Sequence, residues 1–165
     1  MRFTLTEYLG PRIVTATVLL EKDRLCLDYQ VDDPGVRWAP FARYVRSDNL
    51  WQDTCLELFI GDADDHQYWE LNLAPHGGWN CYRLTGYRTG ITPSDDFELL
   101  NLDVDPQRFR AELRFGILPE RMTIGPSAVI REGEKLAYFA LQHQDKPDFH
   151  DRTLHQVIDR RALYT

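Results

Sequence analysis

The chain has 165 residues, of which 43% are hydrophobic and 27% charged, and this composition excludes a disordered chain. Lysine and arginine number 19 against 26 aspartates and glutamates, a formal net charge of −7 at pH 7. This balance disfavours nucleic acid and membrane partners, since both attract basic patches. The length suits one domain, and we expect it to span residues 1–165.

The N-terminal segment and the cysteines predict a cytoplasmic protein. Residues 1–12 contain Glu7 and Pro11 and lack the apolar stretch of a signal peptide. Cys26, Cys55 and Cys81 occur singly, without a C-x-x-C spacing that would indicate zinc or redox chemistry. We expect buried, reduced thiols.

Apolar and polar residues alternate along most of the chain, a pattern that predicts about nine short strands separated by turn residues. In chain order the predicted strands are 13–21, 24–31, 54–60, 68–73, 79–84, 97–104, 108–115, 127–131 and 136–143. Helical turns are expected only near residues 119–122 and 150–156, the second with Asp148 or Asp151 as its cap. The predicted fold class is all-β, a single-domain antiparallel β-sandwich of the jelly-roll or immunoglobulin-like kind.

The middle three strands, 54–60, 68–73 and 79–84, differ from ordinary sandwich strands because both of their faces carry apolar residues. The predicted inner face holds Leu56, Leu58, Ile60, Trp69, Leu71, Leu73, Tyr82 and Leu84. The predicted outer face holds Cys55, Glu57, Phe59, Tyr68, Glu70, Asn72, Trp79, Cys81 and Arg83. Sugars bind such surfaces, because an aromatic ring stacks on the sugar while planar polar groups bond its hydroxyls. A surface ion pair of Glu57 or Glu70 with Arg83, with Trp79 under the long loop 36–50, is the structural alternative.

Three blocks of sequence resemble one known group of proteins. WQDTCLELFI at residues 51–60 is followed by YWELNLAPHG at 68–77 and by RAELRFGILP at 110–119. In order and spacing these blocks resemble family 9 carbohydrate-binding modules and the related DOMON-like domains, whose fold is a β-sandwich. The resemblance implies that Trp51 stacks on a sugar, that Glu57 bonds its hydroxyls and that Arg83 also contacts the ligand.

The C-terminal loop 142–150 departs from that family pattern, because no tryptophan follows Trp79. Phe149 is the candidate for the second stacking aromatic. The loop resembles that of a subgroup of small, stand-alone bacterial DOMON-like proteins. It also holds His143, Asp148 and His150, which could contact a ligand, hold the loop against the sheet, bind a metal or transfer protons.

These patterns predict a non-catalytic module that binds a saccharide or a similar small polar ligand. The candidate site residues are Trp51, Glu57, Arg83, His143, Asp148, Phe149 and His150. The alternatives are a metal-binding protein or hydrolytic enzyme that uses the loop around His143–His150, and a protein-interaction domain that has lost the sugar site. No G-x-S-x-G or H-E-x-x-H motif occurs, and no cofactor is expected. The oligomeric state stays open.

Overall fold

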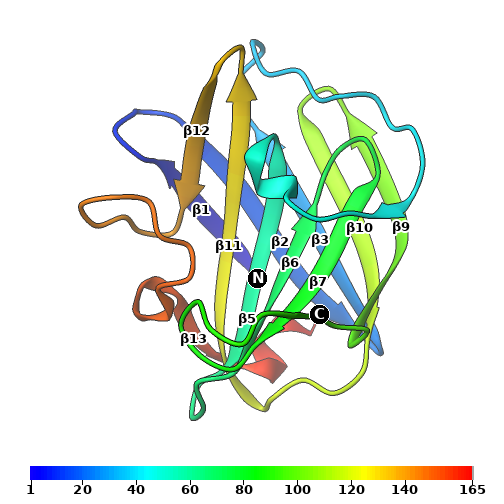
Figure 1. Ribbon diagram of the computed structural model, residues 1–165, viewed down its shortest axis with the longest axis vertical. Helices are drawn as coiled ribbons and strands as arrows, with labels where there is room; N and C mark the ends of the chain where they lie inside the picture. Colours follow the sequence, from blue (N-terminus) through cyan, green and yellow to red (C-terminus); the bar gives the residue numbers. More distant parts are fainter. Residues whose placement is uncertain (165) are drawn as a thin grey trace.

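The computed structural model describes residues 1–164, which form 13 strands and three short 3₁₀ turns (Figure 1). The strands are β1 (Arg2–Glu7), β2 (Ile13–Glu21), β3 (Arg24–Val31), β4 (Val45–Arg46), β5 (Cys55–Asp62), β6 (Tyr68–Leu73), β7 (Gly78–Leu84), β8 (Thr92–Pro93), β9 (Phe97–Asp105), β10 (Arg108–Phe115), β11 (Arg121–Glu132), β12 (Lys135–Ala140) and β13 (Gln156–Asp159). The 3₁₀ turns are η1 (Leu50–Gln52), η2 (Arg152–Leu154) and η3 (Arg160–Leu163). Asp151 caps η2 by accepting from the amide of Thr153, whereas residues 119–122 form no helical turn and lead into β11.

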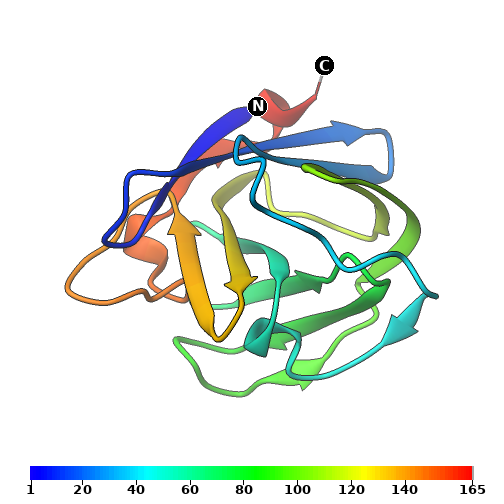
Figure 2. The same ribbon diagram turned by 90° about the horizontal axis from the view of Figure 1, so that it is seen from above.

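All 13 strands belong to one curled sheet, in the order β4-β7-β6-β5-β11-β12-β1-β2-β3-β10-β9, with β13 beside β11 and β8 beside β7. Neighbouring strands are antiparallel except for β4 and β7, which run parallel. The sheet turns where β12 meets β1, since only two residue pairs join these strands. We call β4, β7, β6, β5 and β11 the front half, and β1, β2, β3, β10 and β9 the back half. Figure 2 shows the two halves facing each other.

The predicted nine-strand sandwich is therefore wrong, although the all-β class is right. The prediction omitted Arg2–Glu7, the strand that pairs with β2 on one side and with β12 on the other. That strand alternates like the others, with Phe3 and Leu5 buried, and it joins the two halves into one half-barrel. Without it, the remaining strands divide into two separate sheets.

The core lies between the two halves. Alternate residues of the back half, such as Leu25, Leu27 and Tyr29 on β3, meet Leu56 and Leu58 on β5. The side chain of Tyr29 crosses the core, and its hydroxyl donates to the backbone carbonyl of Glu57. This packing fixes the position of β5 and leaves its opposite face available for a site. No helix among the described residues is long and apolar enough to cross a membrane.

Candidate functional site

The outer face of the front half carries a row of polar side chains that crosses four strands. The strand register aligns Ser127 of β11 with Glu57 of β5, Glu57 with Asn72 of β6, and Asn72 with Asn80 of β7. We call these four residues the polar row. The next row along the strands contains Phe59, Glu70 and Tyr82, so two carboxyl groups lie diagonally across β5 and β6.

The polar row is withdrawn from solvent. Glu57 and Asn72 are each only 2% exposed. Ser127 Oγ donates to Glu57 at 3.4 Å, and Asn72 Nδ2 donates to Glu70 at 2.8 Å. Asn72 Oδ1 has no partner within the described residues, which leaves one buried acceptor unsatisfied.

Burial controls the protonation of this site. Burial raises the pKa of Glu57 well above its ordinary value, and the neighbouring Glu70 raises it further. Burial also raises the pKa of Glu70, although the hydrogen bond from Asn72 lowers it in part. Burial therefore favours the neutral form of the Glu57 carboxyl group, which can donate as well as accept.

The prediction of which residues of 79–84 face outward is wrong. Asn80 and Tyr82 occupy the outer face, and Cys81 lies in the core between the halves. Arg83 points to the same side as Cys81, where it lies over the Trp69 ring, 5.8 Å from its centroid, and donates to Gln67. The structure therefore does not bring Arg83 together with Glu57 or Glu70. Both faces of this strand carry apolar residues, so hydrophobicity alone does not decide which of its residues face the core.

Trp51 lies in η1, at the end of the outer face, and is 51% exposed. The turn packs against β5 and β6, and its buried residue Leu50 clusters with Cys55 and Ala74. The segment after η1 leads into β5 and thus to Glu57, which lies deep in the face while Trp51 remains open. Trp51 and Glu57 are six residues apart in the chain, and they combine an accessible ring with a buried carboxyl group.

Residues 141–151 lead from the end of β12 to η2 along the edge of the outer face, and we call this segment the strap (Figure 1). Its later residues, Asp148 and Phe149, cover part of that face beside β11. Phe149 is half-buried and packs edge-on against Tyr138, with ring centroids 6.2 Å apart. Asp148 accepts from Tyr87 Oη at 2.5 Å and from Arg88 at 2.9 Å, and these bonds fasten the strap to the loop after β7. Burial alone would raise the pKa of Asp148, but the bonds from Tyr87 and Arg88 lower it.

His150 joins the strap to the polar face. Its Nδ1 lies 2.8 Å from Tyr68 Oη, which also accepts from the Arg88 amide at 3.2 Å. Its Nε2 lies 3.7 Å from Glu70, too far for a hydrogen bond. Burial, followed by the nearby Arg88, lowers the pKa of His150 to about 4. The imidazole is neutral at pH 7, so its contact with Glu70 is not an ion pair.

His143 is directed elsewhere. Its Nε2 lies 2.7 Å from the Thr6 carbonyl, and its ring packs against Tyr8 with centroids 5.5 Å apart. Within residues 1–164, no three histidine, cysteine or carboxylate side chains are grouped in a way that could hold a metal ion. The cysteines Cys26, Cys55 and Cys81 are unpaired, and the last two are buried.

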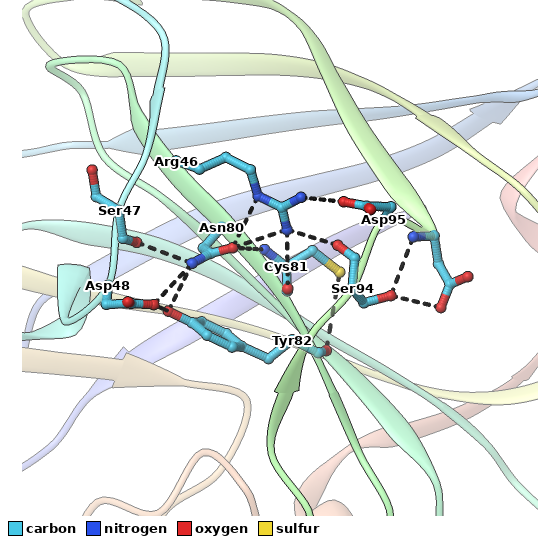
Figure 3. A network of polar contacts seen from close by, with 9 residues as sticks. Arg46, Ser47, Asp48, Asn80, Cys81, Tyr82, Ser94 and Asp95 are labelled. Atoms are coloured by element: carbon cyan, nitrogen blue, oxygen red, sulfur yellow. Dashed lines mark hydrogen bonds and ion pairs between the residues drawn. The ribbon is translucent and has the colours of Figure 1, made fainter.

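A second polar network lies at the β7 end of the row (Figure 3). Asn80 Nδ2 donates to Asp48 Oδ1 at 3.0 Å, and the Tyr82 hydroxyl donates to the same oxygen at 2.5 Å. Asn80 Oδ1 accepts from Arg46, whose guanidinium lies 4.8 Å from the Trp79 ring centroid. Trp79 was expected on the outer face, but it lies on the side of Cys81 and packs against the core between the halves, with Arg46 of the segment 36–50 over its ring.

Sequence reasoning placed Glu57, Glu70 and Asn72 on this face but missed Asp48, Asn80 and Tyr82. Asn80 and Tyr82 alternate along one strand, and this pattern could have placed them on the same face. They were missed because the two faces of that strand were assigned the wrong way round. Asp48 gave no local signal, because its partners are more than 30 residues away.

Little space remains beneath the strap. A cavity of about 10 Å³, roughly the room for one water molecule, is lined by Ser127, Phe149 and His155 among others. A wider groove of about 630 Å³ lies at the end of the molecule nearer η1, where Asp53, Thr54, Pro75 and His76 form part of its lining.

No protein-family model matches the chain, and no curated protein sequence matches it. The chain is similar to the crystal structure of a protein from Bacteroides uniformis that is provisionally named a carbohydrate-binding protein. The match has a TM-score of 0.71 and covers 100% of this chain and 86% of that chain, with 11% sequence identity. At this identity the similarity shows a shared fold.

Proposed function

We propose that the protein is a non-catalytic carbohydrate-binding protein whose site lies on the outer face of β5, β6 and β7. The observation that carries the proposal is a half-exposed Trp51 ring on a turn that packs against β5 and β6, the strands whose buried polar row contains an unsatisfied amide oxygen on Asn72. An exposed ring can stack on a sugar, and planar amide and carboxyl groups can bond its hydroxyls.

Two comparisons support this proposal. The fold is that of the Bacteroides uniformis protein, whose provisional name refers to carbohydrate binding. The three sequence blocks resemble family 9 modules and stand-alone DOMON-like proteins, and assignment to that subgroup is part of the proposal. In this assignment Trp51 supplies the stacking surface, and Glu57 supports the site from beneath.

The test is a titration of the purified protein with neutral mono- and oligosaccharides, followed both by tryptophan fluorescence and by isothermal titration calorimetry. Calorimetry is needed because Trp51→Ala removes a fluorophore as well as a contact. Saturable heat with the wild-type protein, reduced at least about tenfold in affinity by Trp51→Ala, supports the proposal. Ile117→Ala is the matched control, since Ile117 is 89% exposed but lies far along the chain in the β10–β11 connection. Absence of saturable binding across the panel refutes the proposal.

A further inference from the structure

Asp48 is the one carboxylate of the β7 network that is both fixed and open to solvent on the outer face. It lies three residues before Trp51, in the segment that enters η1. One of its oxygens, Oδ1, accepts from Asn80 Nδ2 and from the Tyr82 hydroxyl. No described group donates to its other oxygen, Oδ2 (Figure 3).

The supports of Asp48 are themselves held in place. Asn80 is 5% exposed, and its amide also donates to the Ser47 carbonyl at 3.3 Å while its oxygen accepts from Arg46 and from the Cys81 amide. Arg46 in turn donates to the Ser94 carbonyl at 2.7 Å and pairs with Asp95. A carboxylate held this way loses little conformational freedom when a ligand binds.

Glu57 is poorly placed for the same task. At 2% exposure its side chain is covered, and the same burial raises its pKa, which disfavours the ionised form. An ionised acceptor forms stronger hydrogen bonds with sugar hydroxyls than a neutral one does. Two exposed carboxylates lie within three residues of Trp51 in the chain. Asp53 pairs with Arg131, whereas Asp48 accepts only from the neutral Asn80 and Tyr82.

We propose that Asp48 is the primary hydrogen-bond acceptor of the site and that it selects uncharged saccharides through Oδ2. This inference rests on the proposed function and identifies the ligand class. The outer face presents carboxyl groups on Asp48, Glu57 and Glu70, and a fourth, on Asp148, is paired with Arg88. The guanidinium groups at this face are already engaged: Arg88 pairs with Asp148 and Arg46 with Asp95. Arg152, over the Tyr68 ring, donates to Thr123 and to the backbone carbonyls of Asp62, Asp65 and Gln67. A uronic acid would meet an anion without a free cation, whereas a neutral sugar would meet an acceptor.

The informative variant is Asp48→Asn. Its amide oxygen can accept from Asn80 and Tyr82 as Oδ1 does, while its amide nitrogen replaces the free acceptor by a donor. The matched control is Asp95→Asn, because Asp95 belongs to the same network through Arg46 but its side chain is 96% exposed on the far side of that arginine. Thermal unfolding of both variants checks that the fold is intact.

Dissociation constants for a neutral saccharide and for the matching uronic acid are measured by calorimetry on the wild-type protein, Asp48→Asn, Asp95→Asn and Trp51→Ala. We expect Asp48→Asn to weaken binding of the neutral sugar at least about tenfold and to reduce the preference for it over the uronic acid, with Asp95→Asn unchanged. If Trp51→Ala abolishes binding while Asp48→Asn alters neither affinity nor preference, the role of Asp48 is refuted and the proposed function stands. Equal losses in Asp48→Asn and Asp95→Asn also refute it, and absence of binding by the wild-type protein refutes both proposals.

Discussion

The hydroxyl of Tyr29, on the back half of the sheet, donates to the backbone carbonyl of Glu57 on the front half. Tyr29 is fully buried, so this bond passes through the core directly beneath the polar row. The backbone that carries Glu57 is thereby held from the side opposite to the candidate site.

We expect Tyr29→Phe to lower the free energy of unfolding by about 1–2 kcal/mol, because the ring is retained while one buried hydrogen bond is lost. Urea denaturation at pH 7 measures the change. Tyr164→Phe, at an exposed ring near the C-terminus, is the control and should change stability very little. An unchanged denaturation midpoint for Tyr29→Phe would show that the cross-core bond contributes nothing to stability.

The strap should loosen in acid. Burial lowers the pKa of both His150 and His155 to about 4, so the folded protein binds fewer protons than the unfolded chain between about pH 4 and pH 6.5. The free energy of unfolding must then fall as the pH decreases through this range. A decrease in the pKa of one imidazole from 6.5 to about 4 corresponds to a loss of about 3 kcal/mol in the free energy of unfolding when the pH falls below 4.

Chemical denaturation at pH 7, 6, 5 and 4 measures this dependence, and His150→Gln should show a shallower slope than the wild-type protein. The side chains that face His150 are Phe59, Tyr68, Glu70, Arg88, Asp148 and His155, and none of them is altered in this variant. His66→Gln, in an exposed turn, is the control. Parallel slopes for His150→Gln and the wild-type protein would contradict the expected pKa.

Glu57 should have the opposite pH dependence. Its pKa is raised in the folded state, so its contribution to stability is fully present below about pH 4.5 and is lost as the pH rises through the folded pKa. We expect the stability of Glu57→Gln relative to the wild-type protein to increase as the pH rises above about 4.5, so its profile should be flatter in that range. Glu134→Gln, in the exposed β11–β12 turn, should follow the wild-type profile. An equal loss of stability in Glu57→Gln at every pH would contradict this expectation. It would show that the carboxyl group contributes through its hydrogen bonds and does not titrate over the measured range.

Arg12 fastens the connection between β1 and β2 to three carboxylates. It pairs with Glu7 at 2.5 Å, with Asp33 at 3.2 Å and with Glu132, while its guanidinium lies 5.7 Å from the Phe139 ring centroid. We expect Arg12→Met to lower the free energy of unfolding by about 2 kcal/mol, because three partly buried carboxylates lose their cation.

The loss in Arg12→Met should shrink at high salt, since screening weakens the wild-type pairs. Thermal unfolding at low and high sodium chloride concentration measures it. The control is Arg121→Met, whose single partner Asp64 is exposed and whose loss should be small. Equal effects of the two substitutions would show that the Arg12 cluster acts as an ordinary surface pair.

The sequence predicted individual strands well where one face alone is apolar. The strand 108–115 was predicted at its observed bounds, because Phe109, Ala111, Leu113 and Phe115 alternate with charged residues. Strand pairing was not predictable in the same way, since it depends on contacts between distant segments. Pairing between β1 and β12, residues separated by more than 130 positions, decides between a half-barrel and a sandwich.

The candidate site was predicted only in part. Alternation placed Glu57, Glu70 and Asn72 on one face, and the structure brings Asp148, Phe149 and His150 to that face as well. Arg83 and His143 lie elsewhere. The position of Arg83 was predicted from a strand with apolar residues on both faces, and that of His143 from a proline-containing loop whose path the sequence does not determine. Asp48 could be found only from its contacts in three dimensions.

β9 is the edge strand of the back half, and the unpaired backbone groups of an edge strand can pair with a strand of another molecule unless they are covered. The Tyr44 hydroxyl accepts from the Leu102 amide, and the segment that carries Tyr44 runs beside this edge (Figure 1). Glu98, Asp103 and Asp105 add negative charges along the same strand, and a register irregularity interrupts its pairing with β10. These carboxylates pair with Arg110 and Arg114 of β10, so both signs of charge lie along the edge. A charged and irregular edge strand is a poor template for adding another strand, and this edge is therefore protected against edge-to-edge pairing.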